Sequence, residues 1–147
     1  MGNRATITTA PFNRDSACIY LHWNGGRESI EAFCAAAKEL GYRPPGNDDA
    51  YAMARLTGLI CTFFGINDAT SVGLGTVRSL IPAGDDNGCF VLGGDWEIVE
   101  RRDWRGRVIN DSDYTPPPAG SPYATMADDL VKQVRRAAAA AKQEVAA

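Results

Sequence analysis

Several features that often reveal a protein's chemistry are scarce in this sequence. Its 147 residues include one histidine and four cysteines, and no two cysteines form a C-x-x-C pair. Zinc sites and thiol redox centres usually need closely spaced ligands of this kind. Each cysteine also has apolar neighbours in the sequence. We therefore expect buried thiols in a reducing compartment, with no metal and no other cofactor.

Long apolar runs and a strong net charge are also absent. No run approaches the roughly 18 apolar residues that a membrane-spanning helix needs, and residues 1–15 lack the apolar core of a secretory signal. The net charge of -3 gives no overall attraction to nucleic acid or to anionic membranes. We expect a cytoplasmic protein without membrane contact, and direct binding to nucleic acid is disfavoured.

The first half of the chain predicts two strands followed by two helices. β-Branched residues favour a strand over 5–10, and a second strand over 17–23 follows a polar turn, so the two can form an antiparallel hairpin. Apolar residues then recur at helical spacing over 27–40 and again over 49–64. The prolines between these helices exclude a continuous helix.

The second half predicts strands joined by glycine-rich turns. Gly93 and Gly94 indicate a hairpin, and alternation in its second strand places Trp96 and Ile98 on one face and Arg101 on the other. A loop over 82–88 precedes this hairpin. The predicted strands are 70–77, 89–92, 95–101 and, after a turn at 103–106, 107–109.

The order of these elements defines the expected fold class. Strands cluster in hairpins and do not alternate with helices, which is typical of an α+β protein with an antiparallel β-sheet, two helices on one face and a C-terminal Ala-rich helix. We expect a core domain over 1–110, a Pro-rich linker over 111–124 and a helix over 125–147. That helix packs on the core or on a second copy, which would make the protein a homodimer.

The stretch "HWNGGR" gives the first candidate site, because it joins a strand to a helix. Free backbone N–H groups at a helix N-terminus attract anions, so a nucleotide or another small ligand could bind there. A tight turn alone also explains the glycines. His22 could act as a general base in a hydrolase or transferase, but its spacing to other residues identifies no partner. The candidate ligand-binding residues are His22, Trp23, Asn24 and Arg27.

The segment "ERRDWRGR" over 100–107 gives the second candidate site. Arginines on a hairpin tip, together with an aromatic residue, suit contact with an acidic protein or with nucleic acid. A solvated hairpin with internal ion pairs is the alternative. The candidate contacts are Arg101, Arg102, Trp104, Arg105 and Arg107, with Asp85 and Asp86 as a weaker acidic alternative.

The segments "MGNRATIT", "IYLHWNGGRESIEAFCAAAKELGYR" and "GDWEIVER" resemble a family of short proteins found across bacteria and their phages. The resemblance covers roughly the first 100 residues and leaves out the Pro-rich segment and the last helix. It implies a phage or mobile-element context, in which small proteins often bind and block a host defence component, as anti-CRISPR proteins do.

We therefore expect a small, non-enzymatic inhibitor that acts by protein–protein interaction. Its partner would be a host protein or nucleoprotein complex, such as a CRISPR-Cas effector. Binding or sequestering of a small ligand or nucleotide at the "HWNGGR" junction is the alternative, and a hydrolase or transferase that uses His22 is a weaker one.

Overall fold

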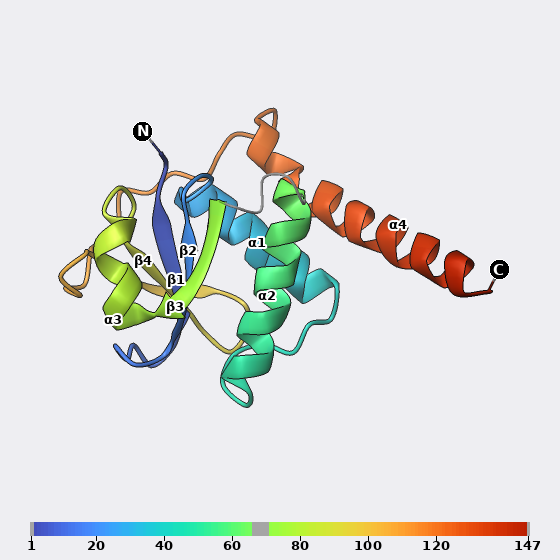
Figure 1. The fold of residues 1–147 in the computed structure, drawn as a ribbon. Coiled ribbons are helices and arrows are strands. Elements are labelled where there is room, and N and C mark those ends of the chain that lie inside the picture. Colours follow the sequence, from blue (N-terminus) through green and yellow to red (C-terminus); the bar gives the residue numbers. More distant parts are fainter. Residues whose placement is uncertain (1, 66–70, 147) are drawn as a thin grey trace.

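The computed structural model describes residues 2–65 and 71–146, and it places a sheet between helices (Figure 1). The five strands have the order β3-β2-β1-β4-β5. Their bounds are β1 Ala5–Thr9, β2 Ala17–Leu21, β3 Val72–Thr76, β4 Cys89–Leu92 and β5 Ile98–Arg102. The helices are α1 Arg27–Glu39, α2 Asp49–Phe64, α3 Val77–Leu80 and α4 Met126–Ala146, with short 3-10 turns at Ile81–Gly84 (η2) and Pro122–Ala124 (η3).

The α+β class and the two predicted hairpins are confirmed. β1 pairs with β2 antiparallel across the polar turn, and β4 pairs with β5 antiparallel across the two glycines. β2 also pairs with β3 antiparallel. The exception is β1 with β4, which run parallel with Thr6 opposite Cys89. The sheet is therefore mixed, because the chain crosses from one side of β1 to the other through its helices.

The main core lies between the sheet and the predicted pair of helices. Ile7, Ile19 and Phe90 from the sheet pack with Phe33 of α1 and Leu56 of α2, and all five are buried. The apolar spacing of both helices accounts for this arrangement, since it turns one stripe of each helix toward the sheet. The side chain of Asp48 accepts a hydrogen bond from the N–H of Tyr51 and caps α2.

The opposite face of the sheet is covered by α3 and η2, and neither was predicted from the sequence. Val77 and Ile81 pack there with Cys18 and Cys89 in a second, smaller core. The reciprocal hydrogen bonds of a capping box join Thr76 and Ser79 and start α3. The strand expected over 70–77 thus ends at Thr76, and residue 70 lies outside the described part of the chain.

The β4–β5 connection corrects the predicted strand over 95–101. Trp96 lies in the turn with φ 54° and is buried, and β5 begins only at Ile98. A register irregularity opposite Val91 and Leu92 follows. Because such a bulge shifts the alternation of side chains, Ile98 and Arg101 both face α1, although strict alternation predicted opposite faces.

The last helix packs on the core by its first turns only. Met126, Leu130 and Val131 are buried against the main core, whereas every residue from Ala137 to Ala146 is exposed. Figure 1 shows α4 extending away from the rest of the molecule. Within residues 2–65 and 71–146, no helix has the length and apolar character to cross a membrane.

Candidate functional site

The arginines of 100–107 do not form one surface. Arg101 faces α1, where its guanidinium lies 2.6 Å from the carboxylate of Asp111. Arg102 points to the other face of the sheet, where it pairs with Glu100 and lies over the ring of Phe12. The strand alternation that separates neighbouring side chains therefore divides the predicted arginine patch in two.

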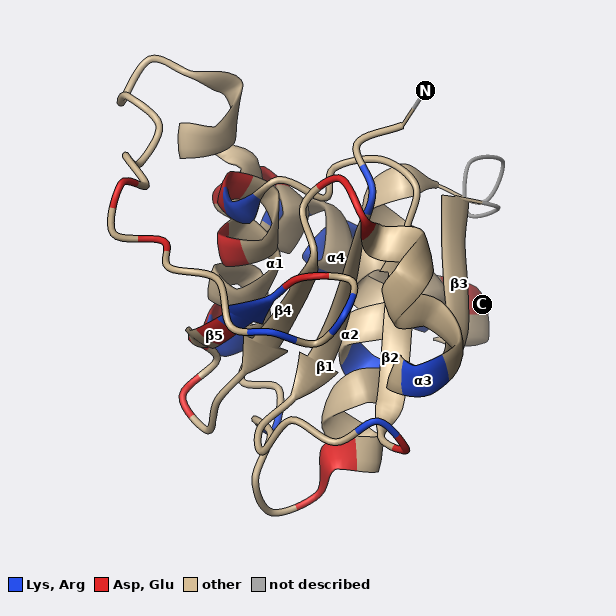
Figure 2. Ribbon diagram, turned by 90° about the vertical axis from the view of Figure 1, so that its left-hand side faces the viewer, with Lys and Arg blue, Asp and Glu red and all other residues tan. Residues whose placement is uncertain are grey.

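The remaining basic residues lie on the loop that follows β5, which we call the hairpin tip (residues 103–107). Figure 2 shows the blue segments of β5 and of this loop close together on the same side of the molecule. Asp103 organises the tip: its carboxylate accepts hydrogen bonds from the backbone N–H groups of Arg105 and Arg107. These bonds, that of Arg107 first, lower the pKa of Asp103 and keep the carboxylate charged.

Two arginines outside the tip fix its backbone further. Arg102 donates to the carbonyl of Gly106 at 2.8 Å, and Arg14 donates to the carbonyl of Arg105 at 2.7 Å. Trp104 is nevertheless 47% exposed, and the guanidinium of Arg105 lies 4.5 Å from its ring centroid. The tip is thus a well-ordered loop that holds a tryptophan and an arginine in solvent.

The acidic alternative, Asp85 and Asp86, lies on the loop before β4 and is largely neutralised by Arg4. The Arg4 guanidinium is 2.9 Å from the Asp85 carboxylate and 3.0 Å from that of Asp86. Hydrogen bonds from Arg4 lower the pKa of Asp86 to about 2. These carboxylates therefore fasten the start of β1 to the loop before β4.

The glycines of the "HWNGGR" junction have a structural explanation. Asn24 adopts a left-handed conformation with φ 55°. Gly25 lies against the N-terminal segment, and a Cβ there would approach the carbonyl oxygen of Asn3 to 2.5 Å. Gly26 is the N-cap of α1. Close approach of two backbone segments requires glycine at position 25, so the turn needs no ligand to account for it.

The four residues predicted at this junction diverge. Nδ1 of His22 lies 3.0 Å from the Tyr20 hydroxyl, and the His22 ring meets Trp23 edge-on with centroids 5.2 Å apart. Trp23 is 47% exposed, and the side chain of Asn24 donates to Ser29 at the start of α1. Arg27 points into a different pocket, so the four side chains do not line one cavity.

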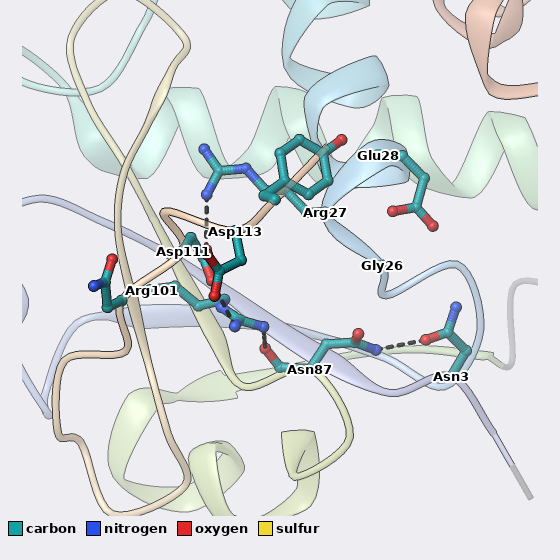
Figure 3. A pocket seen from close by; sticks show the side chains of 10 residues that line it. Asn3, Gly26, Arg27, Glu28, Asn87, Arg101, Asp111 and Asp113 are labelled. Atoms are coloured by element: carbon teal, nitrogen blue, oxygen red, sulfur yellow. Dashed lines mark hydrogen bonds and ion pairs between the residues drawn. The ribbon is translucent and has the colours of Figure 1, made fainter. Parts of the chain in front are cut away.

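That pocket, which we call the polar pocket, has a volume of about 360 Å³ (Figure 3). Its residues come from five separate segments of the chain. Arg27 and Arg101 both point toward Asp111, at 2.7 and 2.6 Å, and Asn87 donates to Asn3 across the floor. The lining consists of Asn3, Gly26, Arg27, Glu28, Asn87, Arg101, Asn110, Asp111, Asp113 and Tyr114.

The charges of the polar pocket differ from those expected at the junction. Asp111 occupies the place between the two guanidinium groups that a bound anion would take, so the chain supplies its own anion. Glu28, in the first turn of α1, and Asp113 also line the cavity. Burial and then the charge of Glu31 raise the pKa of Tyr114 to about 12, so its hydroxyl stays neutral. The pocket therefore favours a neutral or cationic polar molecule over a phosphate.

Most residues of the polar pocket were not predicted from the sequence. Asp111 and Tyr114 belong to a segment assigned as a linker, yet Asp111 holds two arginines and Tyr114 stacks on Arg27 at 4.9 Å. Their polar and aromatic character within a Pro-rich segment was the available signal. Across the described residues, no group of three or more His, Cys, Asp or Glu side chains could hold a metal ion.

Comparisons with protein-family models, with curated proteins and with solved structures give no match to this chain.

Proposed function

We propose that this protein is a non-enzymatic binding protein whose hairpin tip contacts an acidic surface of a partner. The observation that carries the proposal is the exposure of Trp104 on a loop that the chain fixes from several sides. Tryptophan and arginine are the residues most enriched among the energetically dominant contacts of protein interfaces. Nothing within the tip needs an exposed indole for folding, because Asp103, Arg14 and Arg102 hold the backbone.

The fixed backbone of the tip also favours a high binding affinity. A loop that is fixed before binding loses little conformational freedom when it docks, so more of the contact energy appears as affinity. Gly106 adopts a left-handed φ of 85°, and its N–H donates to the carbonyl of Asp103. The tip thus has a closed backbone geometry that keeps Trp104 and Arg105 in one arrangement.

The charges of the tip indicate the chemistry of the partner. Arg107 pairs with Asp103 at 2.8 Å, whereas Arg105 stacks on Trp104 and can offer its guanidinium edge to a partner. A guanidinium on an aromatic face is suited to a bidentate contact with a carboxylate. We assign the partner as a host protein or nucleoprotein complex, and the resemblance to bacterial and phage proteins supports blocking of a host defence complex as the outcome.

The test uses a matched pair of variants in capture experiments with cells of the native host. Trp104 and Trp23 are equally exposed, at 47%. We expect Trp104→Ala combined with Arg105→Ala to lower the affinity for the captured partner by a factor of ~10 to 100. Trp23→Ala should leave the affinity unchanged, and circular dichroism verifies the fold of both variants. Equal loss in both variants, or in neither, would contradict the proposal.

The polar pocket supports a second candidate function, the binding of a small polar molecule. The supporting observation is that Glu28 and Asp113 line the cavity while both arginines pair with Asp111. A panel of amines, polyols and nucleotides tests this by thermal unfolding, since a ligand of the native state raises the melting temperature. A shift with amines or polyols that disappears in Glu28→Gln supports the pocket, and an unshifted melting temperature across the panel removes it.

A further inference from the structure

The two outer strands of the sheet differ in how they are protected. β5 carries Glu100, Arg101 and Arg102, and residues 107–109 return beside it through a bridge between Arg102 and Val108. β3 has the sequence VGLGT and pairs with β2 alone among the described strands. Natural proteins usually protect an outer strand with charge, proline or a covering segment. β3 contains neither a charged residue nor proline.

The hydrogen bonds at both ends of β3 define which of its backbone groups face outward. His22 donates to the carbonyl of Ser71, and Val77 donates to the carbonyl of Ser16. Because hydrogen-bonded and non-bonded pairs alternate in an antiparallel ladder, Gly73 bonds to β2, whereas the N–H and C=O of Val72 and Leu74 point away from it. These four backbone groups can pair with another strand.

The far end of β3 is different, because Thr76 is occupied within the chain. Its N–H donates to the hydroxyl oxygen of Ser79 at 3.1 Å, and its carbonyl accepts a hydrogen bond from the same hydroxyl at 3.0 Å. Only the short segment 72–74 is therefore available for pairing.

Two residues of this segment, Leu74 and Gly73, also indicate that another strand binds here. Leu74 is 66% exposed, although its cross-strand neighbour Ile19 is buried. The fold does not require glycine at position 73, because a Cβ there would meet Tyr20 only at ordinary contact distance, 3.5 Å. At Gly75, in contrast, an added Cβ would lie only 2.9 Å from the hydroxyl oxygen of Ser79, so the fold itself requires glycine there. When a protein's own fold does not require a glycine within a strand, that glycine often marks a place where another backbone approaches closely.

We propose that β3 pairs antiparallel with β3 of a second copy, about a two-fold axis beside Gly73. In this register Val72 lies opposite Leu74 of the second copy, and Leu74 lies opposite Val72 of the second copy. All four outward groups of each strand are then hydrogen-bonded, and the exposed leucines are covered by apolar partners. The segment 72–74 is self-complementary in this sense, which identifies a second copy as the occupant. The two five-stranded sheets become one continuous sheet.

This dimer differs from the one predicted through the C-terminal helix, and substitutions separate the two. We expect the full-length protein to show a concentration-dependent dimer in sedimentation equilibrium. Leu74→Lys places charges on both sides of the β3 contact and should weaken the dimer at least ~10-fold. Val145→Lys, at the 90% exposed valine of α4, is the control and should leave dimerisation unchanged. Dissociation by Val145→Lys instead would assign the dimer to α4 and overturn the proposal, as would a protein that stays monomeric up to millimolar concentration.

Cysteine cross-linking tests the register directly. Opposed Gly73 residues form a non-hydrogen-bonded pair with Cα atoms ~4.5 Å apart, a separation that a disulfide spans. Under mild oxidation we expect Gly73→Cys to form a covalent dimer much faster than wild type, which reports any contribution of the native thiols. If the wild-type protein dimerises but Gly73→Cys cross-links no faster than Leu74→Cys, the two-fold axis beside Gly73 is wrong.

Discussion

The indole N–H of Trp96 donates a hydrogen bond of 2.9 Å to the backbone carbonyl of Tyr42. This contact joins the β4–β5 turn to the loop between α1 and α2, two segments that are distant in the sequence. It accompanies a left-handed backbone at Trp96, with φ 54°, an uncommon conformation for a large side chain. The burial of the indole in the main core, together with this bond, offsets the strain of that conformation.

We expect Trp96→Phe to lower the free energy of unfolding by about 1 kcal/mol, because it removes the donor but keeps most of the apolar volume. Trp96→Ala should cost about 3–5 kcal/mol, since it also leaves a cavity. Urea unfolding measures both values. Trp23→Phe is the control, and its half-exposed ring predicts a change below about 0.5 kcal/mol. Equal effects at the two positions would refute the anchoring role of Trp96.

The Asp111 carboxylate should be more important for stability than an exposed carboxylate. Asp111→Asn leaves two partly buried arginines without their shared anion, so we expect a loss of about 1–3 kcal/mol in the free energy of unfolding. Hydrogen exchange of residues 110–114 should rise in the same variant. Asp95→Asn breaks only the solvent-exposed pair with Lys38, and about 0.5 kcal/mol or less is expected there. Similar losses in both variants would show that Asp111 acts as an ordinary surface charge.

The pairing of Asp86 with Arg4 predicts a specific response to acid. Arg4 lowers the pKa of Asp86 from 3.8 to about 2. Because the pKa of Asp86 is lower in the folded protein than in the unfolded chain, its carboxylate stabilises the folded protein at pH values above 3.8. This contribution disappears as the pH falls toward about 2. A carboxyl titration by nuclear magnetic resonance should place the midpoint of Asp86 near 2 in wild type, and Arg4→Gln should raise it toward 3.8. Arg107→Gln, remote from Asp86, is the control; an unmoved midpoint in Arg4→Gln would disprove the cause.

The cysteines should react with a thiol reagent in two classes. Cys18, Cys34 and Cys89 are buried, and Cys61 is partly exposed. Burial raises the pKa of Cys34 to about 12, which keeps its thiol protonated and unreactive. We expect the native protein to react quickly at Cys61 alone and at all four thiols in denaturant. Cys61→Ser should abolish the fast phase, and a fast phase that persists would contradict this assignment.

The exposed part of α4 should contribute little to the stability of the core. Residues 137–146 are all exposed, so deletion of 137–147 should change the free energy of unfolding by less than about 0.5 kcal/mol. Leu130→Ala, in the buried first turns, should cost about 2–5 kcal/mol. Urea unfolding of both proteins measures the contrast. A large loss on truncation would indicate that the exposed residues contact another surface in solution.

Local patterns were sufficient to predict the hairpins and the two core helices. Helical spacing from Ile30 to Leu40 and the prolines that follow α1 determine structure over a few residues, independently of the rest of the chain. The T-x-x-S pattern of Thr76 and Ser79 was also present and could have indicated α3. The parallel pairing of β1 with β4 has no such signal, because it depends on which strands meet after the helices fold.

The candidate sites were less predictable for the same reason. The arginines of 100–107 looked like one patch, but a strand sends Arg101 and Arg102 to opposite faces, and only Trp104, Arg105 and Arg107 share the tip. Asp111 meets Arg27 across a sequence separation of 84 residues. No periodicity in the sequence encodes such a meeting, which results from the position of the Pro-rich segment over α1 and β5.

The central place of β1 has a consequence for synthesis of the chain. During synthesis β1 leaves the ribosome before both of its neighbours in the sheet, and one of them, β4, follows more than 80 residues later. Until then β1 and β2 form a hairpin with one side of β1 unpaired, and a two-stranded hairpin alone is only marginally stable. The emerging chain must therefore carry an open strand of alternating threonine and apolar residues, which makes the interval before β4 emerges the stage most exposed to aggregation.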